Sequence, residues 1–305
     1  MATLNSDVCI VGHFALDTIT VPGRDKPFHN LGGAATYTSF AVKTLEGKAS
    51  VISRVGGDFP EAYMWWLHEE GIDVSAVKRY PQETTTHFEL AYTKDFERTL
   101  KLTCKGYPIS PDDIPKDLHA KAVHIAPITN ELSYETIKHL KGCCEILSLD
   151  PQGFLRSFDE NGNVTQNLQA DKRILSLINV YKSCQDELYA ITGQSELKAA
   201  VRAVHDFGVE TVIVTMGEKG ALLSVEGAQY SIPACKSKVL VDPTGAGDVF
   251  MGGFLTEYLR QKESLWCAAM GSASASMVVE GIGSTYFGEK TEILKRATEL
   301  YEKEL

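Results

Sequence analysis

Residues 241–255, Val-Asp-Pro-Thr-Gly-Ala-Gly-Asp-Val-Phe-Met-Gly-Gly-Phe-Leu, constrain the fold more than any other stretch of the chain. The apolar run 238–241 predicts the end of a strand, and the apolar-rich residues 249–259 predict a helix. Gly245 and Gly247 have no Cβ, so the backbone between the two elements can turn tightly. The stretch therefore predicts a strand, a glycine turn and a helix in direct succession.

The predicted turn has the composition of an anion-binding site. Main-chain N–H groups at a helix start have no partners within the helix, and the positive end of the helix dipole lies at the same point. Asp248 would be a poor phosphate ligand there, because like charges repel. It is suited to take a proton from a hydroxyl that attacks a phosphoryl group, so the segment indicates phosphoryl transfer. A Gly-x-Gly turn that binds no ligand is the alternative.

Composition and charge narrow the class of protein. The chain has 305 residues, 44% of them hydrophobic, which suits a globular protein with a large core. A net charge of −10 argues against nucleic acid or an anionic membrane as the main partner. Seven cysteines without metal-ligand spacing and an N-terminus unlike a signal peptide favour a cytoplasmic protein. No apolar run reaches the roughly 18 residues that predict a membrane span.

Short apolar runs alternate with helical patterns along the chain. The predicted strands lie at 7–13, 49–58, 122–127, 145–150 and 177–181, and residues 210–223 are predicted as strand, loop and strand. This alternation indicates a doubly wound α/β sheet. Residues 84–93 and 98–104 alternate apolar and polar side chains around Lys94-Asp95, which predicts a hairpin. Within an α/β series such a hairpin suggests a separate small sheet, although an ordinary surface hairpin has the same pattern.

Two motifs in this order resemble the signatures of the ribokinase (PfkB) family of carbohydrate kinases. The first is Asn30-Leu-Gly-Gly33 ahead of a predicted helix, and the second is Asp242-Pro-Thr-Gly-Ala-Gly-Asp248. The second motif is not a P-loop, because no Gly-Lys-Ser/Thr follows it. The resemblance extends from Val8 to about Thr285.

The resemblance implies both fold and assembly. We expect an α/β fold, a ribokinase-like three-layer α/β/α sandwich with a small β-sheet lid, as a single kinase domain over residues 1–305. The lid strands are expected from about 14–22 and 84–105. In the family such a lid covers the substrate and often forms the dimer contact, so a homodimer through the lid is expected.

The resemblance also implies roles for individual residues in an ATP-dependent kinase. Asp248 is the general base, and the N–H groups of Gly245, Ala246 and Gly247 stabilise the transferring phosphoryl group. The implied substrate-binding residues are Asp17, Asn30, Gly32, Gly33, Gln152 and Arg156. The implied nucleotide-binding residues are Thr215, Gly217, Gly220, Thr244, Gly281 and Gly283, the last two in a loop that can also bind a monovalent cation. The implied Mg²⁺ residues are Glu187 and Asp242.

Structural roles remain open for several of these residues. Asp17 can be a turn carboxylate, Gln152 and Arg156 can be structural, and Glu187 can be an exposed helix carboxylate. The family has an Asn-x-x-Glu motif before a Thr-Gly pair. When that pair is aligned with Thr192-Gly193, Cys184 takes the place of the asparagine, which weakens the match to this motif.

The first motif departs from ribokinase itself, which carries Lys and Asn shortly after its Gly-Gly. Here Ala34 and Tyr37 take those places, so the pocket is more apolar and ribose is a doubtful substrate. We expect a small polyhydroxylated acceptor, a sugar or a cyclitol such as myo-inositol. A nucleoside kinase and a non-catalytic nucleotide- or sugar-binding relative are the alternatives.

Overall fold

The computed structural model describes residues 5–21, 26–92, 98–167 and 169–305. The strands of its central sheet are β1 Asn5–Val11, β4 Ala49–Gly56, β5 Val77–Tyr80, β8 His119–Ile125, β9 Cys144–Leu149, β12 Val180–Cys184, β13 Thr211–Thr215, β14 Ala221–Val225 and β15 Ala228–Ile232. They pair in the order β15-β14-β13-β12-β9-β8-β1-β4-β5. All pairs from β13 to β5 are parallel, and β14 and β15 add antiparallel strands at one edge.

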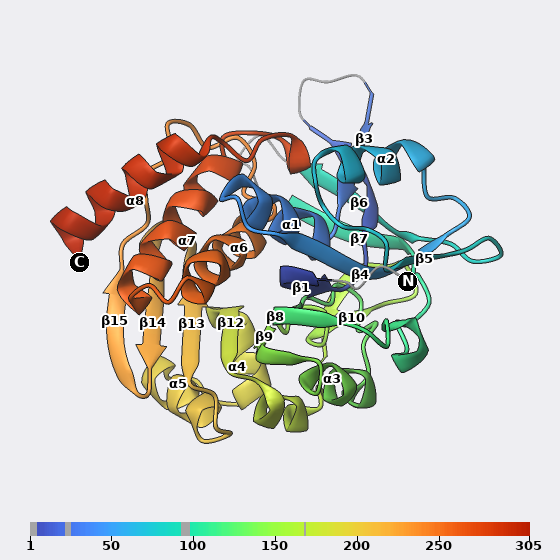
Figure 1. Ribbon diagram of the computed structural model, residues 1–305. Helices are drawn as coiled ribbons and strands as arrows, with labels where there is room; N and C mark the ends of the chain where they lie inside the picture. Colours follow the sequence, from blue (N-terminus) through green and yellow to red (C-terminus); the bar gives the residue numbers. More distant parts are fainter. Residues whose placement is uncertain (1–4, 22–25, 93–97, 168) are drawn as a thin grey trace.

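Helices cover both faces of this sheet. They are α1 Ala34–Thr44, α2 Glu61–Glu69, α3 Tyr134–Lys141, α4 Gln185–Thr192, α5 Leu197–His205, α6 Ala246–Leu259, α7 Ser264–Val278 and α8 Lys290–Glu304. Figure 1 shows α1, α6, α7 and α8 on one face and α3, α4 and α5 on the other. Among the described residues, no helix has the length and hydropathy that crossing a membrane requires.

The side chains of β1 explain why both faces need a helical layer. Val8 and Ile10 belong to one buried core, and Cys9 and Val11 belong to a second core on the opposite face. A strand that is apolar on both sides must be covered on both sides, which is typical of parallel sheets. The three-layer α/β/α sandwich predicted from the sequence is confirmed.

A separate four-stranded sheet pairs in the order β3-β2-β6-β7. Its strands are β2 Ala15–Thr20, β3 Phe28–Gly32, β6 Thr86–Tyr92 and β7 Arg98–Cys104. Three of them fall in the ranges 14–22 and 84–105, and β3 is a fourth strand that the sequence patterns did not reveal. The predicted turn at Lys94-Asp95 and the position 22 lie outside the described residues. We call this element the small sheet.

A short hairpin connects the main body to the small sheet. It consists of β10 Arg156–Phe158 and β11 Val164–Gln166. At its tip, the Leu102 N–H on β7 donates to the Gly162 carbonyl at 2.8 Å. The hairpin therefore covers part of the outer edge of β7.

Two strand predictions need correction. Residues 238–241 form no strand, and Val239 and Leu240 are 53% and 40% exposed. Their apolar run has no neighbouring strand to pair with, and the Val241 N–H instead donates to the carbonyl of Val279. The strand predicted at 177–181 lies three residues later, at Val180–Cys184, because a 3-10 helix occupies Lys172–Leu177.

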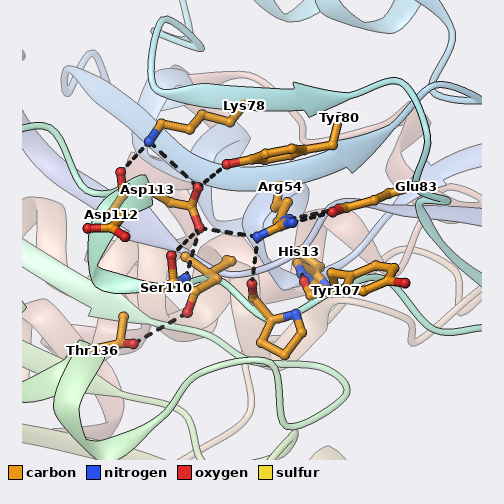
Figure 2. A network of polar contacts seen from close by, with 12 residues as sticks. His13, Arg54, Lys78, Tyr80, Glu83, Tyr107, Ser110, Asp112, Asp113 and Thr136 are labelled. Atoms are coloured by element: carbon orange, nitrogen blue, oxygen red, sulfur yellow. Dashed lines mark hydrogen bonds and ion pairs between the residues drawn. The ribbon is translucent and has the colours of Figure 1, made fainter.

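A network of polar contacts ties the segment that follows β7 to β4 and β5 (Figure 2). Arg54 donates to Glu83 at 2.8 Å and lies over the Tyr80 ring, 3.8 Å from its centroid. Asp113 is 1% exposed and accepts hydrogen bonds from Tyr80 (2.7 Å) and from the N–H and hydroxyl of Ser110 (2.8 and 2.9 Å). We call this set the Asp113 network.

Candidate active site

A cavity of about 240 Å³ lies between the small sheet, the start of α6 and the carboxyl ends of central strands. Ligands of open α/β sheets bind at this end of the strands. The lining residues are Asp17, Gly33, Ala34, Tyr37, Phe88, Leu90, Leu100, Ile128, Asp150, Gln152, Arg156, Lys182, Cys184, Glu187, Thr215 and 243–248. The cavity thus brings together residues from both motifs, which lie more than 200 positions apart in the chain.

The glycine turn forms one wall of the cavity. Gly245 precedes α6 with φ of 77°, in the left-handed region that favours glycine. A Cβ on Gly245 would also lie 2.1 Å from the ring of Tyr37, so the aromatic ring packs directly on this backbone. The Ala246 N–H makes a long turn bond to the Pro243 carbonyl at 3.3 Å. The N–H groups at the start of α6, together with its dipole, favour an anion at this wall.

Asp248 lies in the first turn of α6 and faces the cavity. Its Oδ1 accepts from Gln152 Nε2 at 3.2 Å, and Gln152 Oε1 accepts from Arg156 at 2.7 Å. Enclosure by protein raises the pKa of Asp248 to about 7; Lys182 opposes the rise and Asp150 adds to it. A carboxylate with such a pKa can accept and release a proton near neutral pH.

Lys182 and Asp150 are cavity residues that sequence reasoning did not select. Lys182 Nζ lies 2.6 Å from Asp150 Oδ2, with both side chains almost fully buried. Burial opposes the charged amine, but the nearby carboxylates, Asp150 foremost, raise the pKa of Lys182 above its ordinary value. The sequence signal that could have identified Lys182 is its position as a lysine at the carboxyl end of an apolar strand.

Asp17 and the Gly32-Gly33 pair meet on the side of the cavity formed by the small sheet. Asp17 on β2 pairs in register with Asn30 on β3 and is 5% exposed. A Cβ on Gly32 would lie 1.8 Å from the Asp17 carboxylate, and one on Gly33 would lie 2.4 Å from the His13 carbonyl. The two glycines thus give room for Asp17 and for a close crossing of two backbones.

Asn30, Gly283 and Asp242 form a separate cluster that does not line the cavity. Ser284 donates to Asn30 Oδ1 (3.2 Å), and a Cβ on Gly283 would lie 2.5 Å from the Asn30 side chain. Asp242 accepts from Tyr92 (2.7 Å), from the Thr244 N–H and from the Gly283 N–H (both 2.8 Å). The cluster joins the 281–284 loop to the glycine turn and to β6. Metal binding by Asp242 stays a prediction.

Glu187 and Thr215 line the cavity, whereas the cavity lining does not include Gly217, Gly220 or Gly281. Glu187 also accepts from the Cys184 N–H at 2.8 Å and so caps α4. Gly220 has φ of 86° and would carry a Cβ 2.0 Å from the Ile232 carbonyl, so a turn requires glycine there whether or not nucleotide binds.

A three-layer α/β body with a separate small sheet and a cavity at a glycine turn is the arrangement of the ribokinase-like fold. The pfkB family carbohydrate kinase profile matches residues 6–291, and the chain belongs to this family of enzymes, which phosphorylate hydroxyl groups. The cytidine kinase of Thermococcus kodakarensis is 30% identical over 91% of this chain and 97% of its own length. The inositol 3-kinase of Arabidopsis thaliana is 26% identical over 93% of this chain and 76% of its own.

Solved structures agree with the fold. A fructokinase double mutant from Vibrio cholerae with fructose, ADP and potassium has a TM-score of 0.82 at 22% identity, covering 97% of this chain and 98% of its own. A pyrophosphate-dependent kinase of the ribokinase family with a pyrophosphate analogue and myo-inositol has a TM-score of 0.79 at 21% identity, covering 94% and 99%. At these identities the similarity shows the ribokinase-like fold.

Proposed function

We propose that the protein transfers the γ-phosphoryl group of ATP to a hydroxyl of a small polyhydroxylated acceptor, with Asp248 as the general base. The observation that carries the proposal is the placement of Asp248, whose pKa is raised to about 7, beside the glycine turn in the cavity. Asp17 lines the same cavity and supplies an acceptor for substrate hydroxyl groups.

In the proposed reaction the acceptor oxygen bonds to the γ-phosphorus, and the bond between that phosphorus and the bridging oxygen breaks. ADP leaves, and the hydroxyl proton passes to Asp248. The N–H groups of the turn stabilise the charge on the migrating phosphoryl group. Removing one such donor typically costs on the order of 3 kcal/mol, or about a hundredfold in rate.

Mg²⁺ is compatible with the residues at the cavity. This ion is usually held by one or two carboxylates, by waters and by the substrate phosphates rather than by a protein cage. Glu187, which lines the cavity, fits that pattern, and bound Mg²⁺ would neutralise phosphate charge. A monovalent cation at the 281–284 loop, a homodimer through the small sheet and a cytoplasmic location remain proposals of the same kind.

The acceptor that we favour is a sugar or a cyclitol such as myo-inositol. The cavity has one buried carboxylate on the side of the small sheet, together with the apolar side chains of Tyr37, Phe88, Leu90 and Leu100. Similarity to an inositol 3-kinase supports a cyclitol. A nucleoside is the second candidate, because the cytidine kinase is the more similar relative, at 30% identity, and apolar walls suit a base.

A matrix of acceptors and donors tests the proposal. Purified enzyme is assayed with myo-inositol, sugars, cytidine and other nucleosides, using ATP with ADP release or pyrophosphate with phosphate release as readout. Turnover of myo-inositol or a sugar with ATP supports the proposal, and turnover of nucleosides alone selects the second candidate. ATP binding without turnover of any acceptor would indicate a non-catalytic relative. Asp248→Asn is the background control.

A further inference from the structure

Lys182 is a buried cation whose position points to a role beyond pairing with Asp150. It lies on β12 one position after Tyr181, which pairs in register with Leu149 on β9, so Lys182 and Asp150 are cross-strand neighbours at the cavity. The lysine is 5% exposed. The backbone ladder already joins these strands, and a buried ion pair adds little net stability compared with apolar residues of similar size.

The ammonium group of Lys182 lies directly against the glycine turn. A Cβ on Gly247 would be 2.5 Å from Lys182 Nζ and 3.2 Å from its Cε. Gly247, unlike Gly245, is not among the glycines with positive φ. A side chain at 247 would displace this ammonium group, so glycine leaves room for the lysine to pack against the turn.

The lysine also faces the acidic side chains of the cavity. Asp150, Asp248 and Glu187 all act on its charge, and Lys182 is the strongest charged influence on Asp248. The other charged groups that act on Asp248 are Asp150, Arg156 and Glu187, and the Tyr37 hydroxyl is close enough to be affected by it. Of the cations in this set, Lys182 is the buried one.

We propose that Lys182 is a positioning residue, which packs against the 245–248 turn and keeps Asp248 in its ionised, proton-accepting form. The proposal rests on the proposed function, because only a base needs to be kept ionised. The predicted effect of Lys182 on the ionisation of Asp248 does not depend on that function. Asp150 holds the ammonium group in place and partly offsets its charge. Removing the lysine and removing its partner should therefore shift the ionisation of Asp248 in opposite directions.

The test is a titration of the carboxyl ¹³C signal of Asp248 in the full chain labelled at aspartate, with the signal assigned by its loss in Asp248→Asn. In the wild type we expect the midpoint at about pH 7. Lys182→Met should raise the midpoint to about 8 or higher, and Asp150→Asn should lower it to about 6, since a charge in close proximity shifts a pKa by roughly 1–3. Lys121→Met, which removes a surface ion pair with Asp7, is the matched control and should leave the midpoint unchanged.

Equal midpoints in Lys182→Met and Lys121→Met would overturn the proposal. If Lys182→Met does not fold by circular dichroism, Asp150→Asn decides, and a midpoint that stays or rises overturns the proposal. The titration needs no substrate, so its result tests the role of Lys182 even if no acceptor is phosphorylated. If an acceptor is found, the acid limb of kcat against pH should move with the midpoint in each variant, whereas a structural role alone would lower kcat without moving that limb.

Discussion

Asp113 and Asp248 are both enclosed aspartates in clusters of charge, yet their pKa values move in opposite directions. Burial works against ionisation at Asp113, but hydrogen bonds from Ser110 and Tyr80 together with Lys78 reverse it, and the pKa falls below its usual value. At Asp248 burial prevails and the pKa rises to about 7. The difference lies in the donors: Asp113 accepts three short hydrogen bonds, whereas Asp248 has a long one from Gln152.

The balance of charge follows the same division. Arg54 and Lys78 match Glu83 and Asp113 in the Asp113 network. The cavity sets Lys182 and Arg156 against Asp150, Asp248, Glu187 and Asp17. Where cations and carboxylates are balanced, the cluster stabilises the fold. Where carboxylates are in excess around a cavity, the pKa of one of them can rise far enough for it to exchange a proton near neutral pH. The comparison thus separates a structural aspartate from a candidate catalytic one.

The largest expected effect comes from exchanging the two aspartates for asparagine. Asp248→Asn should lower kcat by about 10²–10⁴-fold, the usual contribution of a general base, with ATP affinity nearly unchanged. Asp113→Asn should leave kcat within about twofold for the protein that is folded. Initial rates and nucleotide titrations of both variants check this, and unchanged kcat in Asp248→Asn would rule out its role as base.

The next effect concerns the stability of the Asp113 network. Arg54→Met removes a partner of Glu83 and Asp113 and leaves both carboxylates without their shared cation. Breaking a buried pair in this way costs roughly 3–5 kcal/mol. We expect a smaller cost here, because Arg54 is partly exposed and solvent screens its charge. Urea unfolding should show a lower midpoint than for Lys121→Met, the surface control. Equal midpoints would mean that the network adds no stability.

The two aspartates should also respond to pH in different windows. Asp248 must lose its proton to act, so kcat should rise with pH and reach half of its plateau near pH 7. Asp113 has a folded pKa below the ordinary 3.8, so its contribution to stability is present above about pH 4 and is lost as pH falls through the folded value. Rate and denaturation profiles over pH measure these windows, and one window shared by both would contradict the comparison.

The smallest expected effect is a gain in stability. Ionising Asp248 in the folded protein is unfavourable, because its folded pKa lies above the unfolded one, so stability falls as pH rises from about 4 through 7. Asp248→Asn removes this cost and should raise Tm by about 2 °C or more at pH 8. A melting curve at pH 8 and another at pH 4 would show the gain only at the higher pH.

Local patterns in the sequence were enough for the architecture and for the glycine turn that lines the candidate cavity. The glycines that shape the turn and the carboxylate of Asp248 are adjacent in the chain. One short stretch of sequence was therefore enough to predict this part of the candidate site. Periodicity also placed most central strands. It misplaced residues 238–241, because an apolar run predicts a strand whether or not a neighbouring strand is available.

Pairings between distant residues could not be read from the chain. Nothing in the sequence around Lys182 indicates its ion pair with Asp150 or its close approach to Gly247, which only the fold creates. Likewise, Asn30 and Gly283 were assigned to substrate and nucleotide separately, but they touch each other across the sequence. Such contacts depend on tertiary packing, which no local pattern encodes.

The contact between Gly247 and Lys182 has a consequence for how this sequence can change over time. Because the backbone at 247 does not itself demand glycine, a methyl group becomes acceptable there once the residue at 182 is shortened. Substitutions at positions 247 and 182 should therefore occur together among descendants of this chain. An alanine at 247 should accompany a side chain shorter than lysine at 182.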